Sequence, residues 1–179
     1  MKPLQSIAMG LVIVAIVAKL NGEYDVLPDP VGWLLVLQGL GGLPATLPHR
    51  PALRVLGLGA LIMSVVLWFP SLSEGLERAD ESLLWAANLP QLGFVALLCH
   101  ALSRAAAAEP GRSRWLRTAS ALTVGAALLP VVVLGADQTS LLDVMVVGGS
   151  LVLLLVIVLL FRYAARPWAR PEVDQTASA

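Results

Sequence analysis

The chain has 179 residues, of which 58% are apolar and 13% are charged, and its formal net charge is zero. An ordinary soluble domain carries about 25% charged residues, so the composition excludes that class and indicates a protein of the lipid bilayer. The cationic side chains form no dense basic block, which argues against nucleic acid as a partner. The one cysteine, Cys99, excludes an internal disulfide and a cysteine-based metal site.

Six apolar runs are long enough to be membrane helices, because a hydrocarbon core of about 30 Å needs roughly 20 mainly apolar residues per helix. We therefore predict an all-α, polytopic membrane helix bundle that forms one domain over residues 1–170. The predicted spans cover residues 4–20, 30–47, 52–69, 82–102, 116–136 and 141–163. The polar segment 171–179 lacks an apolar period and is predicted to be a disordered cytoplasmic tail.

The charges between the spans predict their orientation. With the N-terminus in the cytoplasm, every lysine and arginine except Lys19 and Arg78 falls on the cytoplasmic side. Every acidic residue except Glu109, Glu172 and Asp174 falls on the outer side. Because cytoplasmic loops collect Lys and Arg, the sequence predicts that both termini are cytoplasmic.

The first span has a second interpretation. Lys2 followed by an apolar run that ends near Ala18 is also the pattern of a secretory signal peptide. The cleavage-site pattern is poor and five further spans follow, so a retained first helix is the simpler interpretation. Cleavage would leave the topology of the other spans unchanged.

The second span starts in the segment DVLPDPVGWLL. Asp29 and Pro30 suit the N-cap and first position of a helix, where the carboxylate meets the positive end of the helix dipole. Gly32 suits close packing and Trp33 suits an interfacial anchor. The alternative is that Asp25 and Asp29, on the outer face, receive a cation or a cationic substrate.

The second and fourth spans resemble each other in sequence. LPDPVGWLLVLQGL of the second aligns with LPQLGFVALLCHAL of the fourth when one residue is gapped, which matches Gly32 to Gly93 and Trp33 to Phe94. Both copies begin an even-numbered span, and each predicted hairpin has an acidic outer loop and a basic inner end. Two interpretations are open. Either the bundle is built of three repeated helix hairpins, or the two segments are similar by chance because the composition is biased.

Polar side chains at membrane depth are the main functional candidates, because lipid cannot satisfy them. Gln38 and Gln91 each lie about 13 Å beyond their helix starts, near the midplane. Asn88 shares a helix face with Gln91, and Pro90 between them predicts a broken helix that lines a polar cavity. We predict a polar pocket between the second and fourth spans. The simpler alternative is interhelical hydrogen bonds, which stabilise by about 1 kcal/mol each.

Other chemistry is poorly represented in the sequence. His49 and His100 both lie toward the cytoplasmic side and could meet, but no acidic or cysteine ligand is near them in sequence, so ordinary interfacial histidines are expected. HExxH, GxSxG and P-loop motifs are absent. We predict that the protein is not an enzyme and holds neither a metal nor a cofactor.

Small residues at helical spacing predict close helix contacts. The pairs are Ser6 with Gly10, Ala60 with Ser64, and Ala121 with Gly125, and a patch follows at residues 148–150. The pattern does not distinguish contacts within the bundle from contacts with a partner subunit or a second copy.

The segment LPDPVGWLLVLQGL resembles the LPDxxGY or LPDxxGW start of a transmembrane helix in a group of small uncharacterised bacterial integral membrane proteins. The resemblance covers about a dozen residues and implies no activity or site. Arginine-rich, lysine-poor usage is typical of a high-GC bacterium, which implies the cytoplasmic membrane. Six spans in this length also resemble the substrate-binding subunit of energy-coupling-factor vitamin transporters.

Two functions remain open from the sequence. The leading prediction is an accessory or scaffold membrane subunit whose small-residue helix faces bind another subunit. The alternative is a small-molecule carrier or substrate-binding transporter subunit that uses Gln38, Asn88 and Gln91, with Asp25 and Asp29 at its entrance. The arrangement of the three amides, around one cavity or on separate surfaces, discriminates between them.

Overall fold

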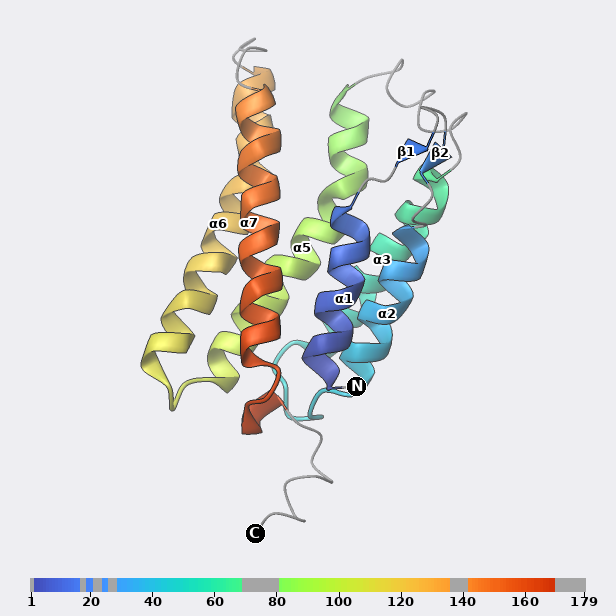
Figure 1. Ribbon diagram of the computed structural model, residues 1–179. Helices are drawn as coiled ribbons and strands as arrows, with labels where there is room; N and C mark the ends of the chain where they lie inside the picture. The colour runs from blue at the N-terminus through green and yellow to red at the C-terminus, as the bar shows by residue number, and fades with distance from the viewer. Residues whose placement is uncertain are drawn as a thin grey trace.

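The computed structural model describes residues 2–16, 19–20, 24–25, 29–68, 81–135 and 142–169, and within these ranges the chain is a bundle of six α-helices (Figure 1). The helices are α1 (Pro3–Ala15), α2 (Asp29–Gly41), α3 (Arg50–Leu67), α5 (Glu81–Ala105), α6 (Pro110–Gly135) and α7 (Leu142–Tyr163). The 3-10 helix η2 (Pro167–Ala169) follows α7, and strand β1 (Lys19–Leu20) pairs antiparallel with β2 (Tyr24–Asp25). The predicted all-α bundle is confirmed.

The helices run alternately up and down, so that α1 begins and η2 ends at the same end of the bundle (Figure 1). Two of the described helical segments, Arg50–Leu67 and Trp85–Ala105, are long and apolar enough to cross a membrane. Pro3–Ala15 and Val147–Tyr163 are apolar but shorter. The predicted tail at 171–179 lies outside the described residues.

Three helices have an end that differs from the predicted span by five residues or more. α1 ends at Ala15 rather than residue 20, because Ile16 is extended and β1 follows. α2 ends at Gly41 rather than residue 47, because tight turns and two prolines lead into α3. α6 begins at Pro110 rather than residue 116, because a proline at the first helical position starts a helix regardless of the arginines that follow.

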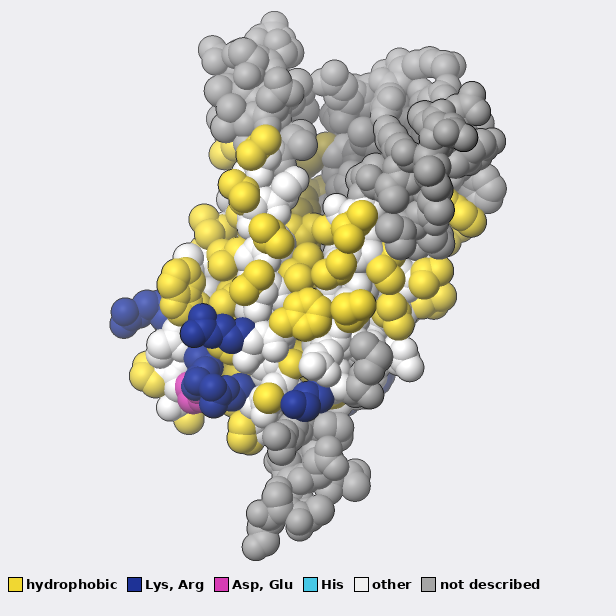
Figure 2. Space-filling model, viewed as in Figure 1, with side chains coloured by type: hydrophobic (Ala, Val, Ile, Leu, Met, Phe, Trp, Pro, Cys, Tyr) yellow, Lys and Arg dark blue, Asp and Glu magenta, His cyan; other side chains and the backbone are white. Residues whose placement is uncertain are grey.

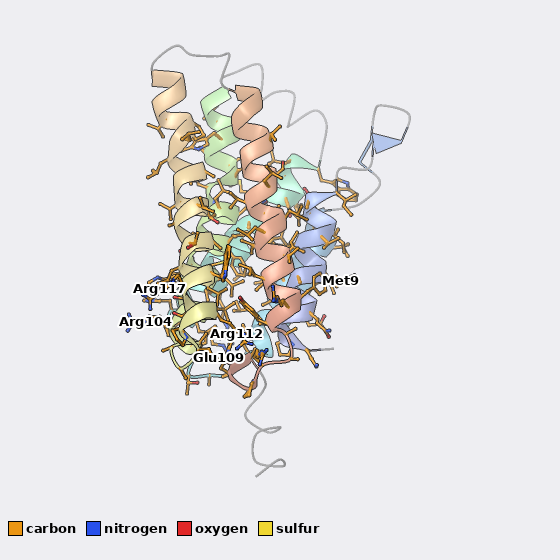
Figure 3. The ribbon with its side chains drawn as sticks, turned by 60° about the vertical axis from the view of Figure 1, so that its left-hand side comes forward. Met9, Arg104, Glu109, Arg112 and Arg117 are labelled. Carbon is orange, nitrogen blue, oxygen red and sulfur yellow. The ribbon has the colours of Figure 1, made fainter. Side chains whose placement is uncertain are left out.

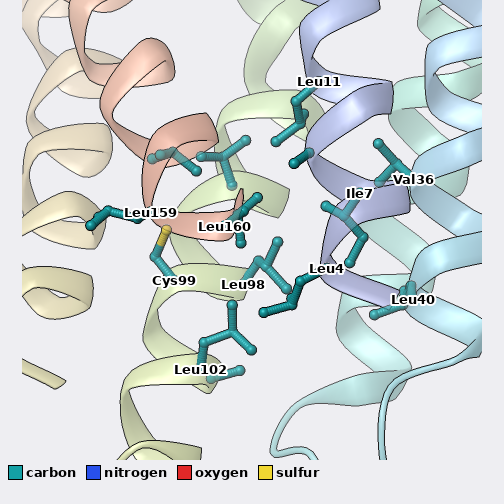
Figure 4. Close-up of a cluster of buried hydrophobic side chains, with 14 of the residues drawn as sticks. Leu4, Ile7, Leu11, Val36, Leu40, Leu98, Cys99, Leu102, Leu159 and Leu160 are labelled. Atoms are coloured by element: carbon teal, nitrogen blue, oxygen red, sulfur yellow. The ribbon is translucent and has the colours of Figure 1, made fainter. Parts of the chain in front are cut away.

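The main core lies where α1, α2, α5 and α7 meet (Figure 4). Leu4 and Leu11 of α1 point toward Leu98 and Leu160, whereas Ile7 lies on the α2 side of the helix. All five side chains are fully buried. In this part of the bundle the apolar sides of four helices have partners.

The two aligned residues of the sequence similarity touch each other in this core. Trp33 of α2 and Phe94 of α5 meet edge to face, with ring centroids 5.4 Å apart. Trp33 is 1% exposed, so the prediction of an interfacial anchor was wrong for this residue. An edge-to-face pair contributes about 1 kcal/mol beyond burial, and here it joins the α2 and α5 sides of the bundle.

α1 and α2 approach each other through glycines. A Cβ atom on Gly32 would lie 2.7 Å from the carbonyl oxygen of Gly10, and one on Gly39 would lie 2.6 Å from a side-chain carbon of Ile7. The hydroxyl of Ser6 donates to the carbonyl of Leu35 across this contact at 2.9 Å. Only residues without a side chain permit such backbone proximity, so the close packing predicted for Gly32 and for the Ser6–Gly10 pair is present.

α5 and α6 are joined by side chains that donate to backbone carbonyls of the other helix. Ser113 donates to the Ser103 carbonyl at 2.9 Å, and Ser120 donates to the Ala96 carbonyl at 2.9 Å. The indole of Trp85 donates to the carbonyl of Ala127 at 3.0 Å. These bonds follow the antiparallel register of the two helices along most of their length.

Candidate functional site

A cavity of about 390 Å³ lies between α5, α6 and α7, within the size range of small-molecule pockets. Trp85, Asn88 and Gln91 border it from α5, and Thr123 and Pro130 border it from α6. Gly149, Ser150, Val152 and Leu153 of α7 form the third side. The wall is therefore mainly apolar with a small number of hydrogen-bonding groups.

Apart from Thr123, the cavity lies where α6 and α7 bury none of their described side chains. On α6, none of the described side chains beyond Thr123 is buried, and on α7 none of those before Val156 is buried. Gly149 adds space, since nothing lies within 4 Å of the position of a Cβ there. The two helices thus leave an unfilled volume beside α5.

Asn88 and Gln91 line this cavity together, because three residues of helix place both amides on one face of α5. The shared helix face is as expected, and a substrate-binding role for the two amides remains a prediction. α5 is not broken at Pro90: the helix is continuous, and a Cβ on Gly59 of α3 would lie 3.5 Å from Pro90. Pro90 therefore packs on α3 instead of opening the cavity.

Gln38 does not join the other two amides. It is exposed on α2, where Gly32, Trp33, Val36 and Gly39 form the buried face. The cavity that holds Asn88 and Gln91 therefore lies beside α6 and α7, and not between the second and fourth spans as predicted. The reason is tertiary, since the α2 face that contacts the bundle is set by its glycines and Trp33.

Of the two acidic residues predicted to lie on the outer face, Asp29 is not among the described residues that line the cavity. Asp29 is the first residue of α2 and is half-buried, as expected of a carboxylate at a helix start. Asp25 lies in β2, where its backbone pairs with Lys19, and its side chain lies outside the described part of the structure. Their suggested cation-binding role remains a prediction.

Two oxygen atoms of the cavity wall can accept hydrogen bonds from a ligand. Thr123 donates its hydroxyl to the Ala119 carbonyl at 2.8 Å, so its oxygen can still accept a hydrogen bond. Pro130 has no N–H for the carbonyl of Ala126, one turn earlier, and both residues border the cavity. None of the described residues that line the cavity is charged.

Sequence reasoning missed the α6 and α7 contributions. Thr123 and Pro130 interrupt an otherwise apolar run, which was the available signal. Trp85 lies near a predicted span end, and the sequence contains no sign that its indole reaches α6.

The two histidines do meet, as their positions allowed. The ring centroids of His49 and His100 are 5.9 Å apart, and both residues are exposed. No group of three or more potential metal ligands occurs among the described residues. Two exposed imidazoles alone are fewer than the three or four protein ligands of ordinary zinc sites.

No protein-family model, curated protein or solved structure matches this chain.

Proposed function

We propose that this protein is a multi-pass membrane protein that binds a small, uncharged, partly apolar molecule between α5, α6 and α7, as a carrier or substrate-binding subunit. The observation that carries the proposal is that Asn88 and Gln91 border one cavity from the same helix face. Pockets of this kind, mainly apolar with few polar groups, are typical small-molecule sites.

The surface supports the membrane part of the proposal. Large apolar side chains are exposed on several helices: Val55 is 70% exposed, and Val147 and Leu151 are each 60% exposed. Figure 2 shows hydrophobic side chains across the middle of the molecule and Lys and Arg gathered below them. Such a surface is unfavourable in water but suits lipid with the basic end in the cytoplasm.

The same proposal includes six membrane-crossing helices with both termini in the cytoplasm of a bacterium. The up-and-down alternation of the helices supports it. α1 and α2 have 13 residues each, or about 20 Å of helix. Local thinning of the bilayer would accommodate this shorter pair.

The chemistry of the wall defines the ligand class. A charged ligand would need a counter-charge at membrane depth, and none of the described lining residues supplies one. The amides of Asn88 and Gln91 offer both donors and acceptors. A neutral molecule with a carbonyl or hydroxyl group and an apolar body fits these groups.

The first experiment is native mass spectrometry of the chain extracted gently from its own membrane. We expect a bound non-lipid mass of a few hundred daltons in the natural sequence. Gln91→Leu should reduce the bound fraction by about tenfold, because one buried hydrogen-bonding group is worth about 1 to 2 kcal/mol. Gln38→Leu is the matched control, since it makes the same change at an exposed position outside the cavity.

A second variant tests the cavity without removing a polar group. Gly149→Leu places a side chain in the open volume and should displace the ligand, whereas Gly148→Leu, which does not line the cavity, should leave it bound. Equal ligand retention in Gln91→Leu, Gly149→Leu and the natural sequence would refute the proposal. So would a folded protein that carries only bulk lipid.

An accessory-subunit function is the second candidate, and one observation favours it. Ala121 and Gly125 are exposed on α6, and nothing lies within 4 Å of a Cβ position on Gly125. A second helix could approach this face closely. If this function is correct, a partner polypeptide should be extracted together with the natural chain, and Gly125→Leu should remove it. Ala86→Leu, at an exposed position of α5, is the control and should leave the partner bound.

A further inference from the structure

We propose that a hollow at the cytoplasmic end of α6 and α7 binds the phosphate headgroup of an anionic phospholipid. The hollow has a volume of about 460 Å³ and is bordered by Arg162 and Tyr163 of α7, by Pro110, Gly111, Arg112 and Trp115 of α6, and by Glu109, which precedes α6. It is separate from the ligand cavity and does not depend on ligand binding there, but it rests on the membrane placement proposed above.

Two arginines from different helices border this hollow. α6 begins and α7 ends here, which brings Arg112 from the first turn of one helix near Arg162 from the last turn of the other. Arginine presents five N–H donors in a planar fork that matches phosphate oxygens. Such basic pockets between helices on the cytoplasmic side suit lipid headgroups.

Arg112 is held in place by a network of side chains at this end of the bundle, where Figure 3 labels it beside Glu109. It forms an ion pair with Glu109, and its guanidinium lies 5.9 Å from the ring centroid of Tyr163. The indole of Trp168 donates to the other oxygen of Glu109 at 3.1 Å. The carboxylate therefore orients Arg112, whose remaining N–H groups can still donate to a phosphate.

The backbone at the start of α6 adds to the electrostatic attraction. Gly111 is exposed, and nothing lies within 4 Å of the position of a Cβ there, so an anion can approach the first turn closely. The N-terminus of a helix carries a partial positive charge and free N–H groups. This feature supports the arginine pair but would not define a site without it.

A lipid, rather than free phosphate, is the occupant because an apolar surface continues from the arginines. Trp115 is 56% exposed beside the hollow. On α7, Val158 and Leu154 lie one and two helical turns before Arg162 on the same exposed face. Val158 is 51% exposed and Leu154 is 56% exposed. Acyl chains can lie along this surface while the headgroup meets Arg112 and Arg162.

The test uses the full chain in lipid nanodiscs or detergent, with phosphatidylglycerol, phosphatidylcholine and inorganic phosphate as separate probes. We expect phosphatidylglycerol to be retained in native mass spectra in preference to phosphatidylcholine. The double variant Arg112→Gln, Arg162→Gln should weaken this retention by about tenfold. Arg54→Gln, Arg114→Gln is the matched control, because both arginines are exposed and neither borders the hollow.

A further variant separates charge from folding. Arg162→Lys keeps the cation and should retain most of the phosphatidylglycerol binding, which a collapsed fold would not. Retention that is equal in the double variant, or equal for the two lipids, would overturn the proposal. It would also be overturned if inorganic phosphate at millimolar concentration raised the unfolding temperature as much as phosphatidylglycerol does.

Discussion

The first helix pair, α1–α2, and the last, α6–α7, contain the same kind of small residues and use them in opposite ways. Gly10 and Gly32 bring the backbones of α1 and α2 into contact, while Gly125 and Gly149 of α6 and α7 have nothing within 4 Å of a Cβ position. A small residue therefore permits close approach but does not cause it. What decides is whether apolar neighbours fill the rest of the interface, as Leu4, Ile7 and Leu11 do for α1.

The difference has a functional consequence. The α1–α2 pair is fixed by backbone contact and by the Ser6 hydrogen bond to α2. α6 beyond Thr123 and α7 before Val156 have no buried side chains among the described residues, and the candidate ligand cavity lies there. The unfilled volume in this part of the bundle is where we propose that a ligand binds.

The largest expected difference in the free energy of unfolding is between two leucines of α7. Leu160→Ala removes a fully buried side chain from the packed half and should lower the free energy of unfolding by about 3 kcal/mol. Leu151→Ala, at a position 60% exposed in the open half, should change it by less than about 0.5 kcal/mol. Thermal or denaturant unfolding in detergent measures both, and equal losses would contradict the division of α7 into two halves.

A glycine-to-alanine substitution is expected to change stability in opposite directions in the two helix pairs. Gly32→Ala should destabilise by about 2 kcal/mol, because the new Cβ would meet the Gly10 carbonyl at 2.7 Å and two backbones must separate. Gly125→Ala should stabilise by about 0.5 kcal/mol, because the helix gains propensity and no clash. Both shifts can be read from unfolding temperatures, and a stabilising Gly32→Ala would refute the close contact.

The smallest effect concerns hydroxyl groups. Ser6→Ala should cost about 0.6 kcal/mol, because it removes the bond between α1 and α2. Ser64→Ala is the control, since that hydroxyl donates to the Leu61 carbonyl within its own helix. The unfolding free energies of the two single variants would show whether the interhelical bond of Ser6 stabilises more than the intrahelical bond of Ser64. Equal losses would contradict the stabilising role of the Ser6 bond.

Some features of the site could be predicted from sequence and others could not. The shared face of Asn88 and Gln91 was predictable, because i and i+3 positions are neighbours on any helix. The separation of Gln38 was not, because it depends on which face α2 turns toward its partners. The contact of Trp33 with Phe94 likewise needed the relative positions of α2 and α5.

The sequence by itself determined where the helices lie and which end of the bundle is basic, because apolar runs, prolines and charges act over a few neighbouring residues. The tertiary structure decided which small residues are in contact, which amides share a cavity and which arginines border one hollow. These depend on side chains far apart in the chain filling one space, and no local pattern records whether that space is filled.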